Sequence, residues 1–240
     1  MVFHDEGFDL SQVLGKAAVM STVAAEPAVK PSLRGVLHQG AAVVAVVVAI
    51  VTVVIAPHPR AMFAGLCFAA SLFTLFAVSA TYHRVHWKTA EARAWMRRAD
   101  HASIFILIAG TYTPVVLCGL PRALGNQMLV VVWLGALVGV LQSLFWINAP
   151  KFVAAVLAVA LGWSITIHWT ETRAALSDVE MLMLIAGGVV YTIGAVVYAL
   201  KRPALWPKTF GYHELFHLCT LVAAALHAWV VYSVIVRSTP

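Results

Sequence analysis

The chain has 240 residues, of which 62% are hydrophobic and 11% are charged, whereas a soluble domain carries roughly 25% charged residues. This composition excludes an ordinary soluble protein, and long apolar runs with only 15 glycines and 10 prolines exclude collagen-like and low-complexity chains. No gap between the apolar runs reaches the roughly 50 residues of a soluble domain, so the chain is expected to form one integral membrane domain. Its formal net charge is +6.

Residues 1–35 precede the first apolar run and are mixed in character. The first ten residues carry three acidic side chains and no Lys or Arg, which is opposite to the basic start of a cleavable signal peptide. We expect a cytoplasmic tail here, with a short interfacial helix and a disordered chain as the alternatives.

Seven stretches without Asp, Glu, Lys or Arg follow, and each is long enough for a helix to cross a hydrocarbon core of roughly 30 Å. They are residues 36–56, 61–82, 102–120, 128–147, 152–170, 181–200 and 215–236. A helix satisfies its own backbone in lipid, whereas the alternating strands of a membrane barrel are absent from this sequence. The predicted fold is therefore all-α and integral to the membrane, with seven transmembrane helices over 36–236 and an external tail at 237–240.

The basic residues predict the orientation, because Lys and Arg are retained on the cytoplasmic side. Twelve of the 16 lie on the side of the N-terminus, and four (Arg60, Arg122, Arg173 and Arg237) lie on the other. We expect a cytoplasmic N-terminus and an external C-terminus in a multi-pass protein of the cell membrane, which is the inner or plasma membrane. The positive charge then indicates contact with lipid headgroups, and no nucleic-acid-binding module is present.

Polar residues of several spans gather at the predicted cytoplasmic side. His83 follows the second span, Asp100 precedes the third, and His213 and His217 lie at the start of the seventh. His213 and His217 are four residues apart and share a helix face, which suits two imidazoles on one metal ion. Ser79 lies one turn deeper than His83, where it can support a ligand or orient a water. These five residues predict a metal site built by three helices.

The other histidines have a simpler interpretation. A single histidine near an interface is usually hydrogen-bonded or faces the headgroups, which is how we interpret His38, His58, His86, His101 and His168. His227 lies ten residues after His217, about 15 Å along a helix, and is therefore too distant to share its metal ion. We expect His227 to pack or pair with a polar group.

The sequence from His213 to His217 also matches the HExxH pattern of zinc proteases, in which the Glu is the general base. Such proteases usually take a third ligand from downstream, but no Asp or Glu follows His217. The extended form of the pattern needs a Gly at position 220 and a His at position 223, but this chain has Thr220 and Ala223 there. An intramembrane protease is thus the least favoured alternative, and we interpret Glu214 as a residue at the lip of the site.

Several short motifs occur in order along the chain. They read Leu33-Arg34-Gly35-Val36-Leu37-His38, Ser79-Ala80-Thr81-Tyr82-His83, Asp100-His101 followed by Leu107-Ile108-Ala109-Gly110-Thr111-Tyr112-Thr113-Pro114, and Gly211-Tyr212-His213-Glu214 to His217. Together they resemble the hemolysin III family, which belongs with the progestin and adipoQ receptors and, more distantly, with the alkaline ceramidases. The resemblance covers most of the chain, from about Lys30 to the last span.

The resemblance implies a seven-helix fold with a zinc ion near the cytoplasmic face. In that pattern His83, His213 and His217 are the ligands, Asp100 binds the metal or its water, and Ser79 lies behind them. The family name refers to haemolysis, while relatives behave as receptors with ceramide-hydrolysing activity. Neither activity follows from the fold alone.

Three imidazoles leave a fourth zinc position open, where a bound water has a pKa of roughly 7. Asp100 is then the candidate base, and Ser79 orients it or the water. The expected function is a zinc-dependent, ceramidase-like amidase or esterase whose partners are membrane lipids, including a lipid substrate. If Asp100 is instead the fourth ligand, the site is closed and structural. Zinc itself is inferred from the ligand type.

Two other functional classes remain open beside the hydrolase. A pore-forming or cytolytic protein would fit the family name, but the seven stretches offer no charged residues to line a wide ionic path. A receptor with a structural zinc site fits seven helices, although the external loops are short. The sequence leaves the substrate or ligand and the oligomeric state unassigned.

Overall fold

The structure is a computed structural model that describes residues 31–146, 149–203, 205–206 and 208–239. Most of the expected N-terminal tail, residues 1–35, lies outside the described residues, as does the interfacial helix considered there.

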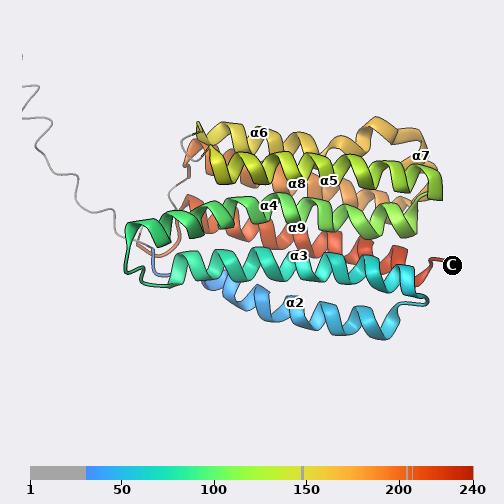
Figure 1. Cartoon of the computed structure of the whole chain (residues 1–240), viewed down its shortest axis with the longest axis horizontal. Coiled ribbons are helices and arrows are strands. Elements are labelled where there is room, and N and C mark those ends of the chain that lie inside the picture. The colour runs from blue at the N-terminus through green and yellow to red at the C-terminus, as the bar shows by residue number, and fades with distance from the viewer. Residues whose placement is uncertain (1–30, 147–148, 204, 207, 240) are drawn as a thin grey trace, which may run out of the picture. The chain divides into compact units, whose positions relative to one another are not determined.

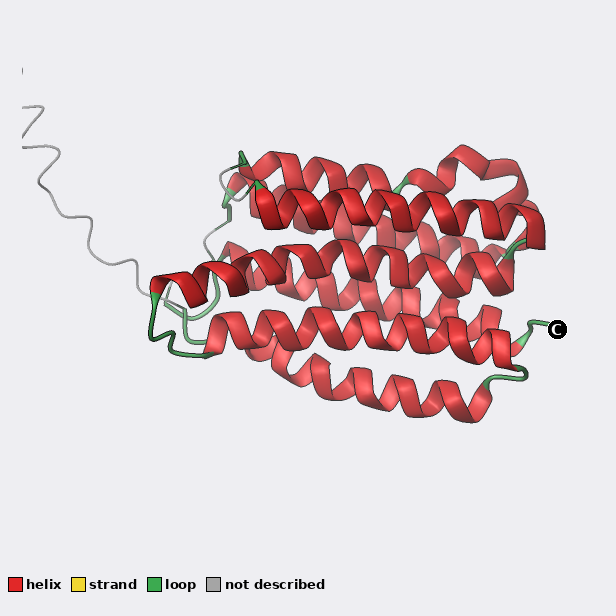
Figure 2. Ribbon diagram, viewed as in Figure 1, coloured by secondary structure: helices red, strands yellow, loops and turns green. Residues whose placement is uncertain are grey.

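The described chain is built from helices joined by short connections (Figures 1 and 2). The helices are α2 (Val36–Ile55), α3 (Pro59–Arg84), α4 (Ala90–Gly119), α5 (Arg122–Phe145), α6 (Lys151–Gly162), the short 3-10 helix η1 (Ser164–His168), α7 (Trp169–Ala175), α8 (Asp178–Leu200) and α9 (Tyr212–Val236). Seven helical stretches in this part of the chain are long and apolar enough to span a membrane, and α6, η1 and α7 together form the fifth. The predicted all-helical fold with seven spans is confirmed.

Several helices extend beyond the charge-free stretches, because charged residues occupy their N-terminal turns, about three of them in α4. Helix α4 begins at Ala90 rather than at residue 102, and α8 and α9 begin early enough to include Glu180 and Glu214. Acidic side chains are favourable there, since the first turn of a helix presents unpaired backbone N–H groups. A search that stops at each charge therefore shortens these helices.

The fifth span was expected as one helix over 152–170, but the structure interrupts it after Gly162. The hydroxyl of Tyr112 on α4 lies at this break. It donates to the carbonyl oxygen of Gly162 at 2.8 Å and accepts from the backbone N–H of Ile165 at 2.9 Å. Irregular backbone is tolerated at membrane depth when protein groups satisfy it, and Tyr112 does so here.

Most helices that are consecutive in the chain pack against each other, and α9 also contacts α2, α3 and α4 (Figure 1). The core contains fully buried apolar side chains such as Phe68 on α3, Phe105 on α4 and Val230 on α9. Exposed valines and leucines cover the outer faces of α2 and α5, as expected of surfaces that meet lipid. The inner helices α3, α4 and α9 are the ones that carry the candidate site residues.

Candidate metal centre

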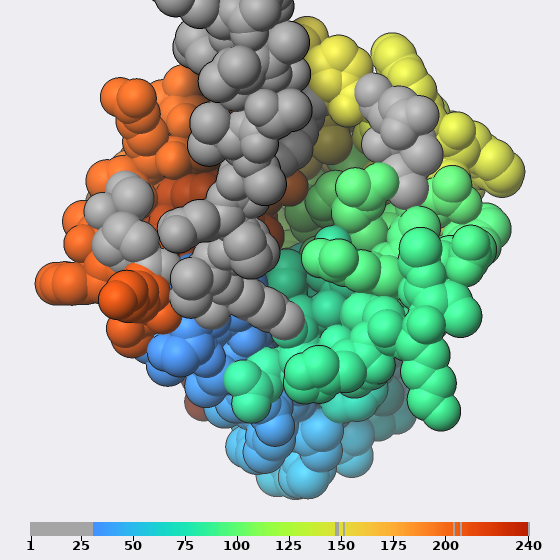
Figure 3. Space-filling model, turned by 90° about the vertical axis from the view of Figure 1, so that its left-hand side faces the viewer, coloured from blue at the N-terminus to red at the C-terminus, as the bar shows by residue number. Residues whose placement is uncertain are grey.

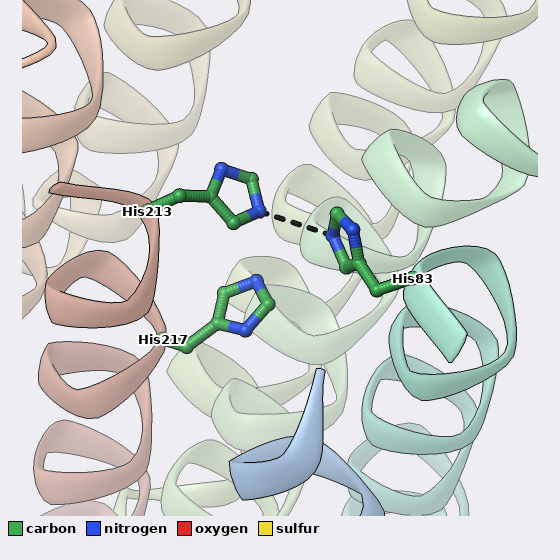
Figure 4. Close-up of side chains that lie close together, drawn as sticks. All are labelled: His83, His213 and His217. Carbon is green, nitrogen blue, oxygen red and sulfur yellow. Dashed lines mark hydrogen bonds between the residues drawn. The ribbon is translucent and has the colours of Figure 1, made fainter. Parts of the chain in front are cut away.

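Three histidines from two helices point toward one another at one end of the bundle (Figure 4). His83 is the penultimate residue of α3, and His213 and His217 lie in the first two turns of α9. One ring nitrogen of each lies within 4.8 Å of the others, and the Nε2 atoms of His83 and His213 are 3.0 Å apart. Two nitrogens bound to one tetrahedral zinc ion lie about 3.3 Å apart. The cluster could therefore hold a metal ion after small ring rotations.

The local sequence explains this arrangement. Helix α9 starts at Tyr212, so His213 and His217 fall on one face a turn apart, as their spacing predicted. Helices α3 and α9 are in contact, which brings His83 to the same level. Figure 3 views this end of the bundle, with the α3–α4 connection in green and the segment before α9 in orange.

Asp100 and Ser79 lie beside the histidines. Asp100 Oδ2 is 3.8 Å from the Nε2 atom of His83, and Ser79 is the hydrogen-bonding neighbour of the Asp100 carboxylate. Ser79 and His83 are both buried. The five residues singled out in the sequence thus meet in one place, while their roles as ligands, base and orienting group stay predictions.

Sequence reasoning missed His38, which we had interpreted as a hydrogen-bonded or headgroup-facing ring. The structure shows it 2% exposed, with its ring stacked on that of His217 at a centroid distance of 3.8 Å and an interplanar angle of 13°. The ring therefore does not face the headgroups, because α2 packs against α9 and buries it between them. The available signal was the position of His38 at the same end of the bundle as His217.

The expectation for Glu214 is also wrong. This residue is completely buried rather than placed at a lip. Its Oε2 accepts the backbone N–H of Gly211 at 2.8 Å, and its Oε1 accepts the Arg34 guanidinium. The carboxylate therefore caps α9 and pairs with a cation, which gives it no resemblance to the free general base of an HExxH protease.

A cavity of about 290 Å³ adjoins the histidine cluster. Asp100, His213 and His217 contribute to its lining near the cluster, and mainly apolar side chains such as Ile104 and Leu184 line the rest. Several helices line the cavity, so an apolar chain inside it would lose much of its contact with water.

Two other histidines behave as expected from the sequence. The ring of His227 lies 3.0 Å from the carbonyl oxygen of Leu184, so this residue pairs with a polar group outside the cluster. His58 caps α3 through the backbone N–H of Ala61 and lies 3.1 Å from the Ser238 hydroxyl.

Comparison with known proteins assigns the chain to a family. The model of the family described as "Haemolysin-III related" matches residues 27–228. The Hemolysin-3 homolog of Bacillus subtilis (strain 168) is 31% identical over 159 residues, which are 66% of this chain and 70% of that protein. Hemolysin-3 of Bacillus cereus is 30% identical over 65% of this chain and 68% of that protein. The human Monocyte to macrophage differentiation factor is 26% identical over 72% of this chain and 68% of its own length. With seven apolar helices and a family match over most of its length, the chain belongs to the haemolysin-III related family of integral multi-pass membrane proteins.

Proposed function

We propose that this protein is a metal-dependent hydrolase that cleaves an amide or ester bond of a membrane lipid, with zinc held by His83, His213 and His217. One observation carries the proposal: the three histidines and Asp100 gather beside a mainly apolar cavity. A cavity of this kind suits an acyl chain, and the cluster would then meet the polar bond next to the chain.

The donor atoms fit a zinc ion. Three imidazole nitrogens favour zinc or another transition metal, whereas magnesium and calcium prefer oxygen ligands. When bound, the metal would supply a Lewis acid for the carbonyl and a water that is acidic enough to react near neutral pH.

The residues around the ion have separate roles in this proposal. The Asp100 carboxylate accepts a proton at Oδ2, and the Ser79 hydroxyl, its hydrogen-bonding neighbour, fixes the direction of that carboxylate. Asp100 Oδ2 lies 3.8 Å from His83 Nε2, so the carboxylate is close to a reacting group at the cluster without having to bind the ion. The apolar walls hold the acyl chain and exclude water from it.

We infer the membrane face from the distribution of charge. The cluster lies at the end of the bundle that carries the basic residues Arg84, Lys88 and Lys208. We therefore place the site near the cytoplasmic face and expect its substrates to come from the lipids of the inner leaflet.

The competing candidate is a structural metal site in a receptor or cytolytic protein. Asp100 Oδ2 lies 3.8 Å from His83 Nε2, so a small movement would make the carboxylate a fourth ligand. This proximity favours the structural alternative. A site with four protein ligands is closed to substrate.

The first test is the metal content of detergent-purified protein, measured by elemental mass spectrometry. We expect about one zinc ion per chain in the wild type and its loss in His83→Ala and His213→Ala. His227→Ala is the matched control, because it removes a half-buried histidine outside the cluster. A folded wild type without metal would refute the proposal. Zinc-loaded protein is then assayed with labelled lipid amides and esters.

A further inference from the structure

The first membrane helix supplies none of the three clustered histidines, yet the segment Ser32–His38 that leads into it contacts both helices that do. Its backbone is tied to the connection before α9: the N–H of Ser32 donates to the carbonyl of Lys208 at 3.1 Å, and that of Leu33 donates to Thr209 at 3.3 Å. This places the segment directly beside the cluster.

Arg34 is the first contact with the cluster. Its guanidinium donates to the buried carboxylate of Glu214, which also accepts the backbone N–H of Gly211. Glu214 directly follows His213 and lies three residues before His217. Because the ion pair holds the first turn of α9, it also sets the position from which both histidines project.

Gly35 is the second contact. It has a φ of 79°, in the left-handed region that favours glycine, and a Cβ built on it would lie 2.7 Å from the Cβ of His83. The absence of a side chain at Gly35 therefore lets the chain pass directly over His83. This close approach leaves no room for a side chain at position 35 and packs the backbone of the segment against the end of α3.

His38 is the third contact. Its ring lies between Phe76 and His217, stacked on His217 at 3.8 Å. An imidazole binds a metal through a lone pair in its ring plane, so an ion in the plane of His217 would lie roughly 3–4 Å outside the plane of His38. His38 thus orients its neighbour's ring and, in this arrangement, does not bind the same ion.

We propose that Ser32–His38 is a positioning segment of the metal centre, in which Arg34 fixes α9 through Glu214, Gly35 admits His83, and His38 orients the ring of His217. The inference rests on the proposed metal site and adds residues that do not ligate the ion. Side chains that orient metal ligands typically contribute 10- to 100-fold to metal affinity.

The test measures the zinc dissociation constant of the purified full chain by competition with a fluorescent chelator, together with the thermal midpoint of the metal-free protein. We expect His38→Ala to weaken zinc binding by about tenfold or more, and His38→Phe to retain most of the affinity because it keeps a stacked ring. We expect Arg34→Ala and Glu214→Gln to weaken binding as well, and the double variant to bind no more weakly than either, since the two side chains act through one ion pair.

The opposite end of the bundle offers a matched control. Glu180 is also a buried carboxylate in the first turn of a helix, and it accepts the Arg237 guanidinium at 2.8 Å. Glu180→Gln should lower the thermal midpoint of the metal-free protein while leaving the zinc dissociation constant unchanged.

The outcomes separate the two proposals. Wild-type protein that binds zinc, with weaker binding in His38→Ala and Glu214→Gln and unchanged binding in Glu180→Gln, supports the positioning segment. Wild-type affinity in the Arg34, His38 and Glu214 variants, with only the thermal midpoint lowered, overturns it and leaves the proposed function intact. A wild type that binds no metal overturns both.

Discussion

Asp100 distinguishes a catalytic metal centre from a structural one. Asp100→Asn removes the negative charge and the proton acceptor while keeping nearly the same shape. If the carboxylate acts on the reacting water, this variant keeps the metal and loses turnover. His213→Ala, in contrast, removes a ligand and should lose both the metal and the activity.

The geometry sets the expected size of the effect. Asp100 Oδ2 lies 3.8 Å from His83 Nε2, close enough for the carboxylate to accept a proton from a water held at the cluster. Asp100→Asn leaves all three imidazoles in place, so we expect at most the 10- to 100-fold loss of metal affinity typical of an orienting group. Loss of a general base lowers the rate by about 10²- to 10⁴-fold.

Both quantities are measurable on the same preparations. Metal content comes from elemental mass spectrometry, and the rate comes from release of labelled acyl chains by zinc-saturated protein. Metal loss in Asp100→Asn as complete as in His213→Ala would refute the reasoning, because it would make Asp100 a ligand of a closed site. Unchanged turnover with bound metal would refute its role as base.

Three further predictions concern stability, topology and metal removal. Gly139→Ala should destabilise the fold by about 1–3 kcal/mol, because the new Cβ would lie 2.1 Å from the buried Phe105 ring. Chemical unfolding in detergent measures this loss, and the additional substitution Phe105→Leu should restore part of the stability. The orientation can be tested in intact cells with variants that lack the native cysteines. An impermeant thiol reagent should label Arg173→Cys and should not label Lys208→Cys. The reverse labelling pattern would show that the proposed orientation is inverted. A chelator should lower the unfolding temperature of the wild type but leave His213→Ala unchanged, since zinc at 100 times its dissociation constant stabilises by about 2.7 kcal/mol; equal shifts in both proteins would contradict binding at the cluster.

Much of the fold was predictable because lipid leaves the backbone few alternatives. Long stretches without charge must form helices that satisfy their own hydrogen bonds, so seven spans follow from the sequence alone. The additional N-terminal turns of α4 and α9 did not follow from the sequence pattern. They contain charged residues, which are stabilised by the unpaired N–H groups of the helix ends and by partner side chains. The interruption after Gly162 did not follow either, because the group that satisfies its backbone, the Tyr112 hydroxyl, is distant in sequence.

The same division holds for the candidate metal site. Spacing of four residues placed His213 and His217 on one face, and the order of the spans brought His83 and Asp100 to their level, so local periodicity and topology were enough to nominate them. Only the tertiary structure revealed the stacking of His38 on His217 and the burial of Glu214. Both depend on how α2 and the segment before it pack against α9, and such packing is set by the complementary shapes of distant side chains rather than by any local pattern.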